Sequence, residues 1–198
     1  MPFPAFLRRS HLFAAFILML QCASSLAGDW ALSDLMHLLA QQKSGKASFV
    51  EKKYIGFLDK PLESSGELSF DAPGRLEKRT TKPRPETMLL DGDKLTLTPY
   101  EKPAINLRLQ EHPEVASVVE SIRGTLSGDK AALEKNYAIE FTGVQGKWQL
   151  TLTPVQKEVA KVVRQIHIGG ADANIKTITF HQADGDRFEM TISKLVAP

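Results

Sequence analysis

Few side chains in this sequence are placed to do chemistry, and their spacing matches no common catalytic or metal-binding motif. Beyond the first 27 residues there are four histidines, and no two of them have the His-x-x-x-His spacing of a helical metal site. They are His37, His112, His167 and His181. The sequence also lacks the Gly-x-Ser-x-Gly motif of serine hydrolases and a glycine-rich phosphate loop. We therefore expect no catalytic residue, no metal and no cofactor.

Two Asp-Gly-Asp triplets, residues 91–93 and 184–186, could suggest calcium ligands. Neither triplet is followed by the remaining ligands of a calcium-binding loop. Both lie between segments that alternate apolar and polar residues, where Asp-Gly is a common tight turn. We interpret both triplets as hairpin turns.

The first 27 residues have the layout of a secretory signal peptide. An arginine pair precedes an uninterrupted apolar run, residues 12–20, and small residues follow at Ser25 and Ala27. The run is shorter than the roughly 20 apolar residues of a membrane-spanning helix. We expect cleavage after Ala27, which leaves residues 28–198 as a single domain.

The only cysteine, Cys22, falls inside this predicted peptide. A lipidated cysteine would follow a small residue, whereas Gln21 precedes this one. Without the peptide the chain has no thiol and no disulfide. It then holds 23 basic and 23 acidic residues, because residues 1–27 contain two of the 25 lysines and arginines and no acid. A formal charge of zero gives no reason to expect a nucleic-acid partner.

Two segments have the periodicity of amphipathic helices. In residues 30–39 apolar side chains recur at i, i+3, i+4 and i+7, and we expect Gly45 to end this helix. The second segment, residues 113–126, begins with a proline that suits a first helical turn. Its apolar side chains share one face and are Val115, Val118, Val119, Ile122 and Leu126.

Nearly all the remaining sequence alternates with a period of two, which is typical of strands with one apolar face. Examples are Leu68 with Phe70, Leu95 with Leu97, Trp148 with Leu150, Ile178 with Phe180, and Phe188 with Met190. The pattern predicts an antiparallel sheet of about nine to eleven strands that is wet on one side. So wide a sheet has to curl toward its apolar face, with the helices closing the mouth. The expected fold is α+β, mainly β: a barrel or part of one.

Several segments, in this order, resemble the periplasmic outer-membrane lipoprotein carrier (LolA-like) family. The similarity is clearest over residues 46–98. The matching segments are Lys46-Ala-Ser-Phe-Val-Glu-Lys-Lys, Ser65-Gly-Glu-Leu-Ser-Phe, Ala72-Pro-Gly-Arg-Leu, Lys82-Pro with Glu86, Asp91-Gly-Asp-Lys-Leu, and later Ile122-Arg-Gly-Thr-Leu-Ser-Gly-Asp. The order and spacing of these segments carry the resemblance, because each of them alone is a weak signal.

The resemblance implies an unclosed antiparallel half-barrel with lid helices on its concave face. It also implies a monomeric carrier in the periplasm that takes acyl chains of lipoproteins, or another lipid, from an inner-membrane donor complex to an outer-membrane acceptor. The expected cavity residues are Phe49, Leu68, Phe70, Leu76, Leu90, Leu95, Leu97, Trp148, Leu150, Phe180 and Met190. The expected lid residues are Leu35, Met36, Val115, Val118, Val119, Ile122 and Leu126.

One position departs from the family pattern. The family carriers have an arginine just before the proline of this region, linked to lid closure, and here the position is Ala72. We therefore expect closure to depend mainly on the apolar face of residues 113–126. The alternative to a carrier is an enzyme or accessory factor that acts on an acylated, glycolipid or polyene lipid in the same cavity.

A basic stretch, residues 75–84, contains five lysines and arginines and one glutamate. Arg75 and Arg79 are out of phase with Leu76, so they belong on the outer face or the rim of the sheet. Two interpretations stay open. The stretch is either a solvated convex face or a rim patch that meets phospholipid head groups or an acidic partner.

Overall fold

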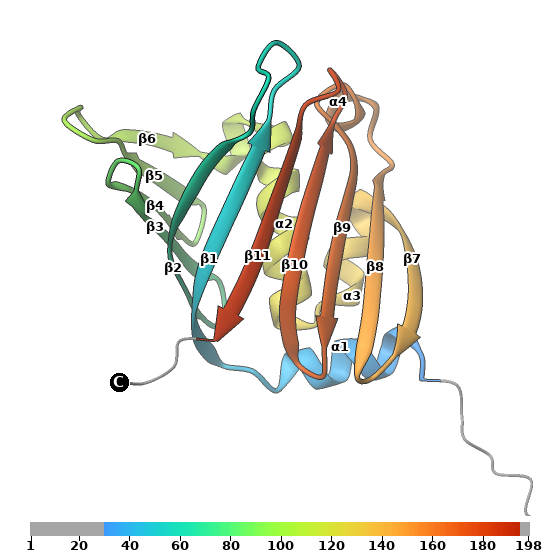
Figure 1. The fold of residues 1–198 in the computed structure, drawn as a ribbon. Helices are drawn as coiled ribbons and strands as arrows, with labels where there is room; N and C mark the ends of the chain where they lie inside the picture. The colour runs from blue at the N-terminus through green and yellow to red at the C-terminus, as the bar shows by residue number, and fades with distance from the viewer. Residues whose placement is uncertain (1–29, 195–198) are drawn as a thin grey trace, which may run out of the picture.

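The computed structural model describes residues 30–194, which form one wide, strongly curved sheet with helices on its concave side (Figure 1). The predicted signal peptide and its cleavage site lie outside the described residues. The strands are β1 Ser44–Tyr54, β2 Leu62–Asp71, β3 Arg75–Lys82, β4 Glu86–Asp91, β5 Lys94–Thr98, β6 Ile105–Arg108, β7 Tyr137–Val144, β8 Lys147–Pro154, β9 Val163–Ala171, β10 Asn174–Gln182 and β11 Arg187–Lys194. The helices are α1 Leu32–Ala40, η1 Leu109–Glu111, α2 Pro113–Ser127, α3 Lys130–Asn136 and α4 Lys157–Ala160.

The eleven strands form a single antiparallel sheet in the order β6-β5-β4-β3-β2-β1-β11-β10-β9-β8-β7. The two edge strands, β6 and β7, do not pair with each other, so the barrel is unclosed. The chain's first and last strands meet in the middle, where Phe49 of β1 pairs with Ile192 of β11. This architecture confirms the predicted α+β, mainly β, half-barrel and the predicted range of strand numbers.

Helix α1 begins at Leu32, two residues later than predicted, and it ends before Gly45. It stops at Ala40, whose carbonyl oxygen accepts a hydrogen bond of 2.8 Å from Lys43 Nζ. Gly45 already lies in β1 and pairs with Phe70 of β2. The prediction that Gly45 ends this helix is wrong, because the ladder with β2 takes up the chain from Ser44 onward.

The main hydrophobic core lies between α1, α3 and the β7–β10 half of the sheet. Its fully buried members are Leu35, Met36, Leu39, Leu133, Tyr137, Trp148, Leu150, Leu152, Val159, Val163, Ile166, Ile168 and Ile178. Val118 and Ile122 of α2 pack against this cluster and remain partly exposed. This half of the concave face is therefore closed by packing.

The most buried face of α2 is small and polar, whereas its valine face is only half-buried. Ser117, Ser121 and Thr125 are at most 3% exposed. Ser117 Oγ donates a hydrogen bond of 2.8 Å to the Tyr137 hydroxyl. Burial raises the pKa of Tyr137 above its ordinary value, and the hydroxyls of Ser117 and Ser121 oppose that rise. Small side chains let α2 approach its neighbours closely and leave the valines free to face the sheet.

Gly128 closes α2 and marks its closest approach to α1. Its φ of 65° is left-handed, and a Cβ placed there would lie 2.0 Å from the carbonyl oxygen of Met36. Only glycine satisfies both the backbone angle and this proximity. The position therefore fixes how α2 sits against α1.

Candidate functional site

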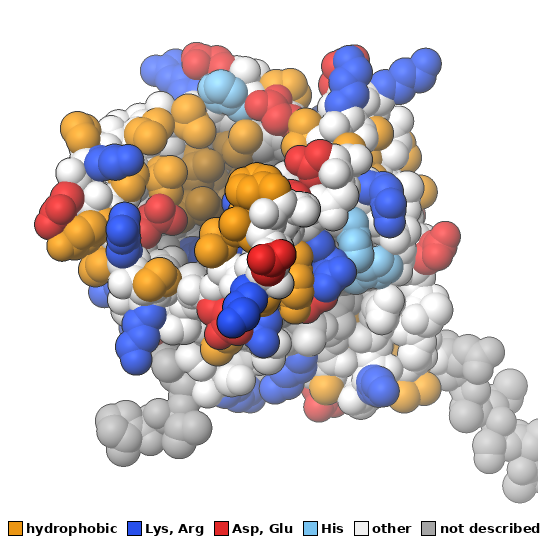
Figure 2. Space-filling view, turned by 45° about the horizontal axis from the view of Figure 1, so that its top comes forward, with side chains coloured by type: hydrophobic (Ala, Val, Ile, Leu, Met, Phe, Trp, Pro, Cys, Tyr) orange, Lys and Arg blue, Asp and Glu red, His pale blue; other side chains and the backbone are white. Residues whose placement is uncertain are grey.

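The β3–β6 half of the concave face is only partly filled. A small core cluster lies there, formed by Leu90, Leu95 and Leu109 with the half-buried Leu76, Leu107, Val115, Ala116 and Val119. Beyond it Met88 and Ile105 remain 37% and 48% exposed. Both lie in register with Leu97, on the same face of the sheet. Figure 2 shows hydrophobic side chains gathered around a recess at this end of the molecule. We call the space between these apolar side chains of β3–β6 and Val115 and Val119 the concave groove.

Two rows of inward-facing side chains cross β2 to β5. The first row consists of Phe70, Leu76, Leu90 and Leu95, which are register partners in successive strand pairs. The second row consists of Leu68, Lys78, Met88 and Leu97. Leu76, Leu90 and Leu95 of the first row belong to the small core cluster. The second row is also apolar, except for Lys78.

The predicted cavity residues fall into two groups by exposure. Those buried in the packed core are Phe49, Phe70, Leu90, Leu95, Trp148 and Leu150. Those that keep part of their surface free are Leu68, Leu76, Leu97, Phe180 and Met190. Only the second group offers apolar surface in this conformation, and Leu76 is the member that also touches the groove cluster.

The predicted lid residues also divide. Leu35 and Met36 of α1 are fully packed in the main core, which makes α1 an integral part of it. Val115 and Val119 of α2 pack on the groove cluster. Leu126 is half-buried and belongs to neither core cluster of the described residues. The amino-terminal half of α2 is thus the helical surface that faces the groove.

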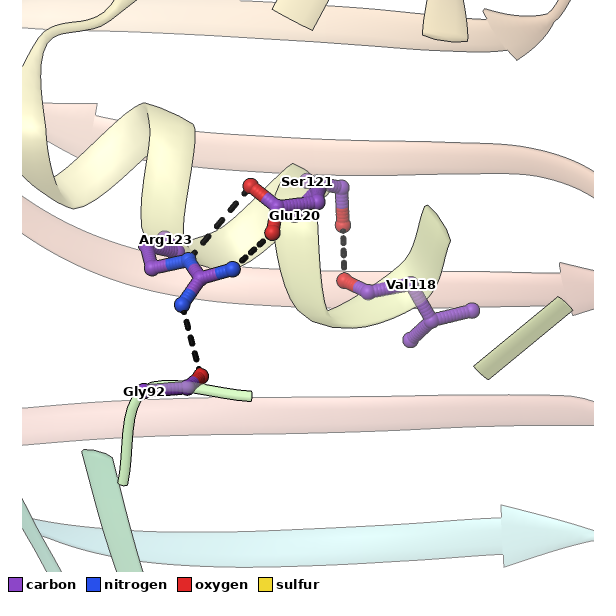
Figure 3. Close-up of polar contacts among 5 residues, drawn as sticks. All are labelled: Gly92, Val118, Glu120, Ser121 and Arg123. Carbon is purple, nitrogen blue, oxygen red and sulfur yellow. Dashed lines mark hydrogen bonds and ion pairs between the residues drawn. The ribbon is translucent and has the colours of Figure 1, made fainter. Parts of the chain in front are cut away.

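Arg123 ties α2 to the sheet by polar contacts (Figure 3). Its Nη1 donates a hydrogen bond of 2.9 Å to the carbonyl oxygen of Gly92, in the β4–β5 turn. Glu120, one turn earlier on the helix, forms a close ion pair with Nη2 and also accepts a hydrogen bond of 3.4 Å from Nε. The side chain lies over Gly74 of the β2–β3 turn, where a Cβ would be 2.9 Å from Arg123 Cδ.

This contact adds a polar connection to the apolar contacts expected between α2 and the sheet. The position before the proline is indeed alanine, and the side chain of Ala72 offers no polar group. Here the arginine comes from the helix instead: Arg123 of α2 reaches the β4–β5 turn. Sequence reasoning missed Arg123, although Glu120 three residues earlier is the spacing of a helical ion pair.

An open cleft of about 590 Å³ borders Arg123 between the β2–β3 and β4–β5 turns and α2. Its charged lining residues are Asp71, Arg75, Asp91, Glu120, Arg123 and Asp129. The chemistry of this cleft is unsuited to an acyl chain, because a long hydrocarbon gains little from such a lining. The concave groove, and not this cleft, is the candidate for an apolar ligand.

Sequence reasoning also missed an ion pair on the concave face. Lys78 Nζ lies 2.6 Å from Glu51 Oε2, and these side chains are 23% and 18% exposed. Lys78 pairs in register with Leu68 and Met88, so it points the same way as the apolar second row. The sequence did indicate that Lys78 points inward, because Lys78 is in phase with Leu76, two residues before it.

The two arginines predicted for the outer face or rim are exposed. Arg75 Nη1 lies 3.6 Å from Asp91, and Arg79 Nη2 lies 2.9 Å from Glu77. Each arginine already has a carboxylate partner. Arg79 lies exposed in its pair with Glu77, whereas Arg75 also lines the open cleft between the strand turns and α2.

Within residues 30–194 no group of three or more His, Cys, Asp or Glu side chains is arranged to hold a metal ion. His167 and His181 lie on neighbouring strands with their rings edge to face, 5.2 Å between centroids.

Within residues 30–194, no helix combines the length and the apolar character needed to cross a membrane.

The fold and the groove define a class of protein: an unclosed antiparallel half-barrel with helices on its concave face. Residues 21–194 match the family described as outer membrane lipoprotein carrier protein LolA-like. Because the match spans most of the chain, the protein belongs to this family, which confirms the resemblance found in the sequence.

Curated relatives are similar at low identity. The chain is 23% identical over 171 residues to an outer-membrane lipoprotein carrier protein of Dechloromonas aromatica, covering 86% of this chain and 79% of that protein. It is 26% identical over 195 residues to a protein of the same name in Ralstonia nicotianae, covering 96% and 87%. Among solved structures, a LolA superfamily protein of Nitrosomonas europaea is similar with a TM-score of 0.42 and 12% identity, covering 84% of this chain and 94% of that chain. The lipoprotein LppX of Mycobacterium tuberculosis has a TM-score of 0.44 and 11% identity, with 86% and 98% covered.

Proposed function

We propose that this protein is a periplasmic carrier that shields the acyl chains of lipoproteins, or of a related lipid, on their way to the outer membrane. The observation that carries the proposal is the concave groove, where two inward apolar side chains of β4 and β6 stay partly uncovered. Met88 and Ile105 keep 37% and 48% of their surface exposed there. Soluble proteins rarely leave such a concave apolar surface without a ligand or partner for it.

The size of the hydrophobic effect is compatible with both uptake and release. Each methylene moved from water into an apolar site contributes about 0.8 kcal/mol, so a chain of roughly 16 carbons gains on the order of 12 kcal/mol gross. Immobilising the chain and opening the protein reduce this gain. A carrier needs a modest net affinity, because it has to hand its cargo to an acceptor.

Helix α2 is the proposed lid. Its amino-terminal half faces the groove through Val115 and Val119, and Arg123, which is paired with Glu120 on the same helix, connects its middle to the β4–β5 turn by a hydrogen bond. A ligand that adds apolar contacts in one position of α2 shifts the population toward that position. We propose no catalytic residue. The partners are a donor complex at the inner membrane and an acceptor at the outer membrane, and the protein acts as a monomer.

The test is binding of a fluorescent fatty-acid probe to Leu76→Glu. Leu76 is half-buried in the groove cluster, so a carboxylate there is costly beside an acyl chain. The matched control is Val50→Glu, which places the same charge at a site that is 49% exposed and out of phase with Phe49. We expect weaker uptake for Leu76→Glu and parental uptake for Val50→Glu. Equal binding by both variants and the parent would remove the groove as the site.

A second measurement separates a carrier from an enzyme. Native mass spectrometry of protein purified gently from its own periplasm should find a bound lipid. That lipid should keep its mass after long incubation with the protein. A change in its mass would favour the enzyme.

A further inference from the structure

The ion pair between Glu51 and Lys78 lies among mainly apolar side chains of the concave face. Across the strands Lys78 is flanked by Leu68 and Met88. Its ammonium also lies 5.0 Å from the ring centroid of Phe49, which is 2% exposed. The pair is therefore built into the inner surface of the half-barrel.

A second lysine on the same face has no carboxylate partner. Lys53 follows Glu51 by two residues on β1, so both side chains point to the concave side, about 7 Å apart along the strand. The ammonium of Lys53 lies 4.5 Å from the ring centroid of Phe188, its register partner on β11. Among the described residues no carboxylate lies within salt-bridge distance of Lys53. Glu51, Lys78 and Lys53 together sum to one positive charge.

Stability alone does not explain this placement. Partly desolvated ion pairs contribute little or cost free energy relative to apolar side chains of similar size. The opposite phase of β1 offers a fully solvated alternative, as Lys52 shows by pairing with Glu63 at 3.3 Å with both side chains about half exposed. Inward charges on an apolar wall are more often retained for a ligand.

We propose that Lys78 and Lys53 bind the head group of an acyl lipid that carries a single negative charge, such as a carboxylate. The acyl chain then lies along the apolar side chains beyond Lys78, from Met88 past Leu97 to Ile105. Glu51 balances one of the two ammonium groups, so that one net positive charge remains for the ligand. This inference rests on the proposed carrier function and specifies the chemistry of its ligand.

The experiment compares two ligands that differ only in the head group. Dodecanoate and dodecan-1-ol compete at pH 8 with a neutral fluorescent probe, N-phenyl-1-naphthylamine, bound to the protein. Charge-assisted hydrogen bonds predict that dodecanoate binds about tenfold more tightly than the alcohol. Dodecyl phosphate, which is mainly a dianion at this pH, should bind no better than dodecanoate.

Three variants test the residues. Lys78→Met and Lys53→Met should each reduce the preference for the carboxylate severalfold, and both should keep the affinity for the alcohol. Lys52→Met is the matched control, because Lys52 lies on the same strand with its side chain on the other face. If Lys78→Met is unfolded by circular dichroism, Lys53→Met carries the test, since it leaves the Glu51–Lys78 pair intact and removes the excess positive charge.

The outcomes are distinguishable. Displacement by neither ligand from the parent protein would contradict the proposed carrier function itself. Equal affinity for dodecanoate and dodecan-1-ol would leave the carrier intact and overturn the head-group site. Tighter binding of dodecyl phosphate would overturn the single-charge assignment. A preference that survives in both lysine variants would place the anion elsewhere.

Discussion

The guanidinium of Arg123 in α2 donates a hydrogen bond of 2.9 Å to the carbonyl oxygen of Gly92 in the β4–β5 turn. Glu120 orients that guanidinium from the same helix. A long side chain with both ends fixed couples the position of the helix to the position of the turn. On the groove side the proposed lid is thus held by this polar contact near its middle and by Val115 and Val119 at its start.

We expect Arg123→Gln to loosen α2 without unfolding the sheet. Loss of a hydrogen bond to a charged donor weakens local protection by about 1 kcal/mol, which corresponds to about fivefold faster hydrogen exchange. Exchange should rise in residues 113–127 and stay parental in residues 137–152. The control is Arg75→Gln, which removes an exposed pair with Asp91 near the same turn. Uniformly faster exchange in Arg123→Gln would mean that α2 is part of the global folding unit.

Tyr137→Phe should destabilise the whole domain. The variant removes the hydroxyl that accepts from Ser117 Oγ and leaves that buried donor without its partner. An unsatisfied buried hydroxyl costs about 1–3 kcal/mol in the free energy of unfolding. Urea unfolding measures the change. The double variant with Ser117→Ala should recover part of the loss, and no recovery would assign the loss to packing around the ring.

Gly128→Ala and Gly92→Ala separate backbone strain from steric clash. The two glycines have similar left-handed φ angles, 65° and 58°. At Gly92 a Cβ meets nothing within 4 Å, whereas at Gly128 it would lie 2.0 Å from Met36 O. Gly92→Ala should cost about 1–2 kcal/mol from the backbone alone. Gly128→Ala should cost about 2 kcal/mol more, because α1 and α2 have to move apart. If both variants lose the same stability in thermal unfolding, the contact between α1 and α2 at Gly128 adjusts at little cost.

Processing can be tested on the exported protein. The small residues Ser25 and Ala27 predict a cut before Gly28. Intact mass should correspond to a chain that starts at Gly28 and carries no lipid. A mass that includes diacylglycerol on Cys22 would instead make the protein membrane-anchored.

The sequence by itself determined the elements and the faces of the strands. The period of two around Phe70 and Leu76 predicted an inward row, and both residues indeed face the helices. The apolar spacing and the proline predicted a helix over residues 113–126, and α2 spans Pro113–Ser127. Local periodicity suffices for these features because it reports which side chains share a face. The order and spacing of the matching segments in residues 46–98 also indicated the family.

Only the tertiary structure decided which apolar side chains are packed and which are free. Leu90 and Leu76 are register partners on one face, yet the first is 2% exposed and the second half-buried. The difference depends on where the helices sit, and that is set by small residues such as Ser117 and Gly128 whose importance no hydrophobic period reveals. The contacts of Arg123 with Gly92 and of Lys78 with Glu51 join residues 31 and 27 positions apart. Such pairs depend on how distant segments meet in space, because a strand's phase gives the face of a side chain but not its neighbour.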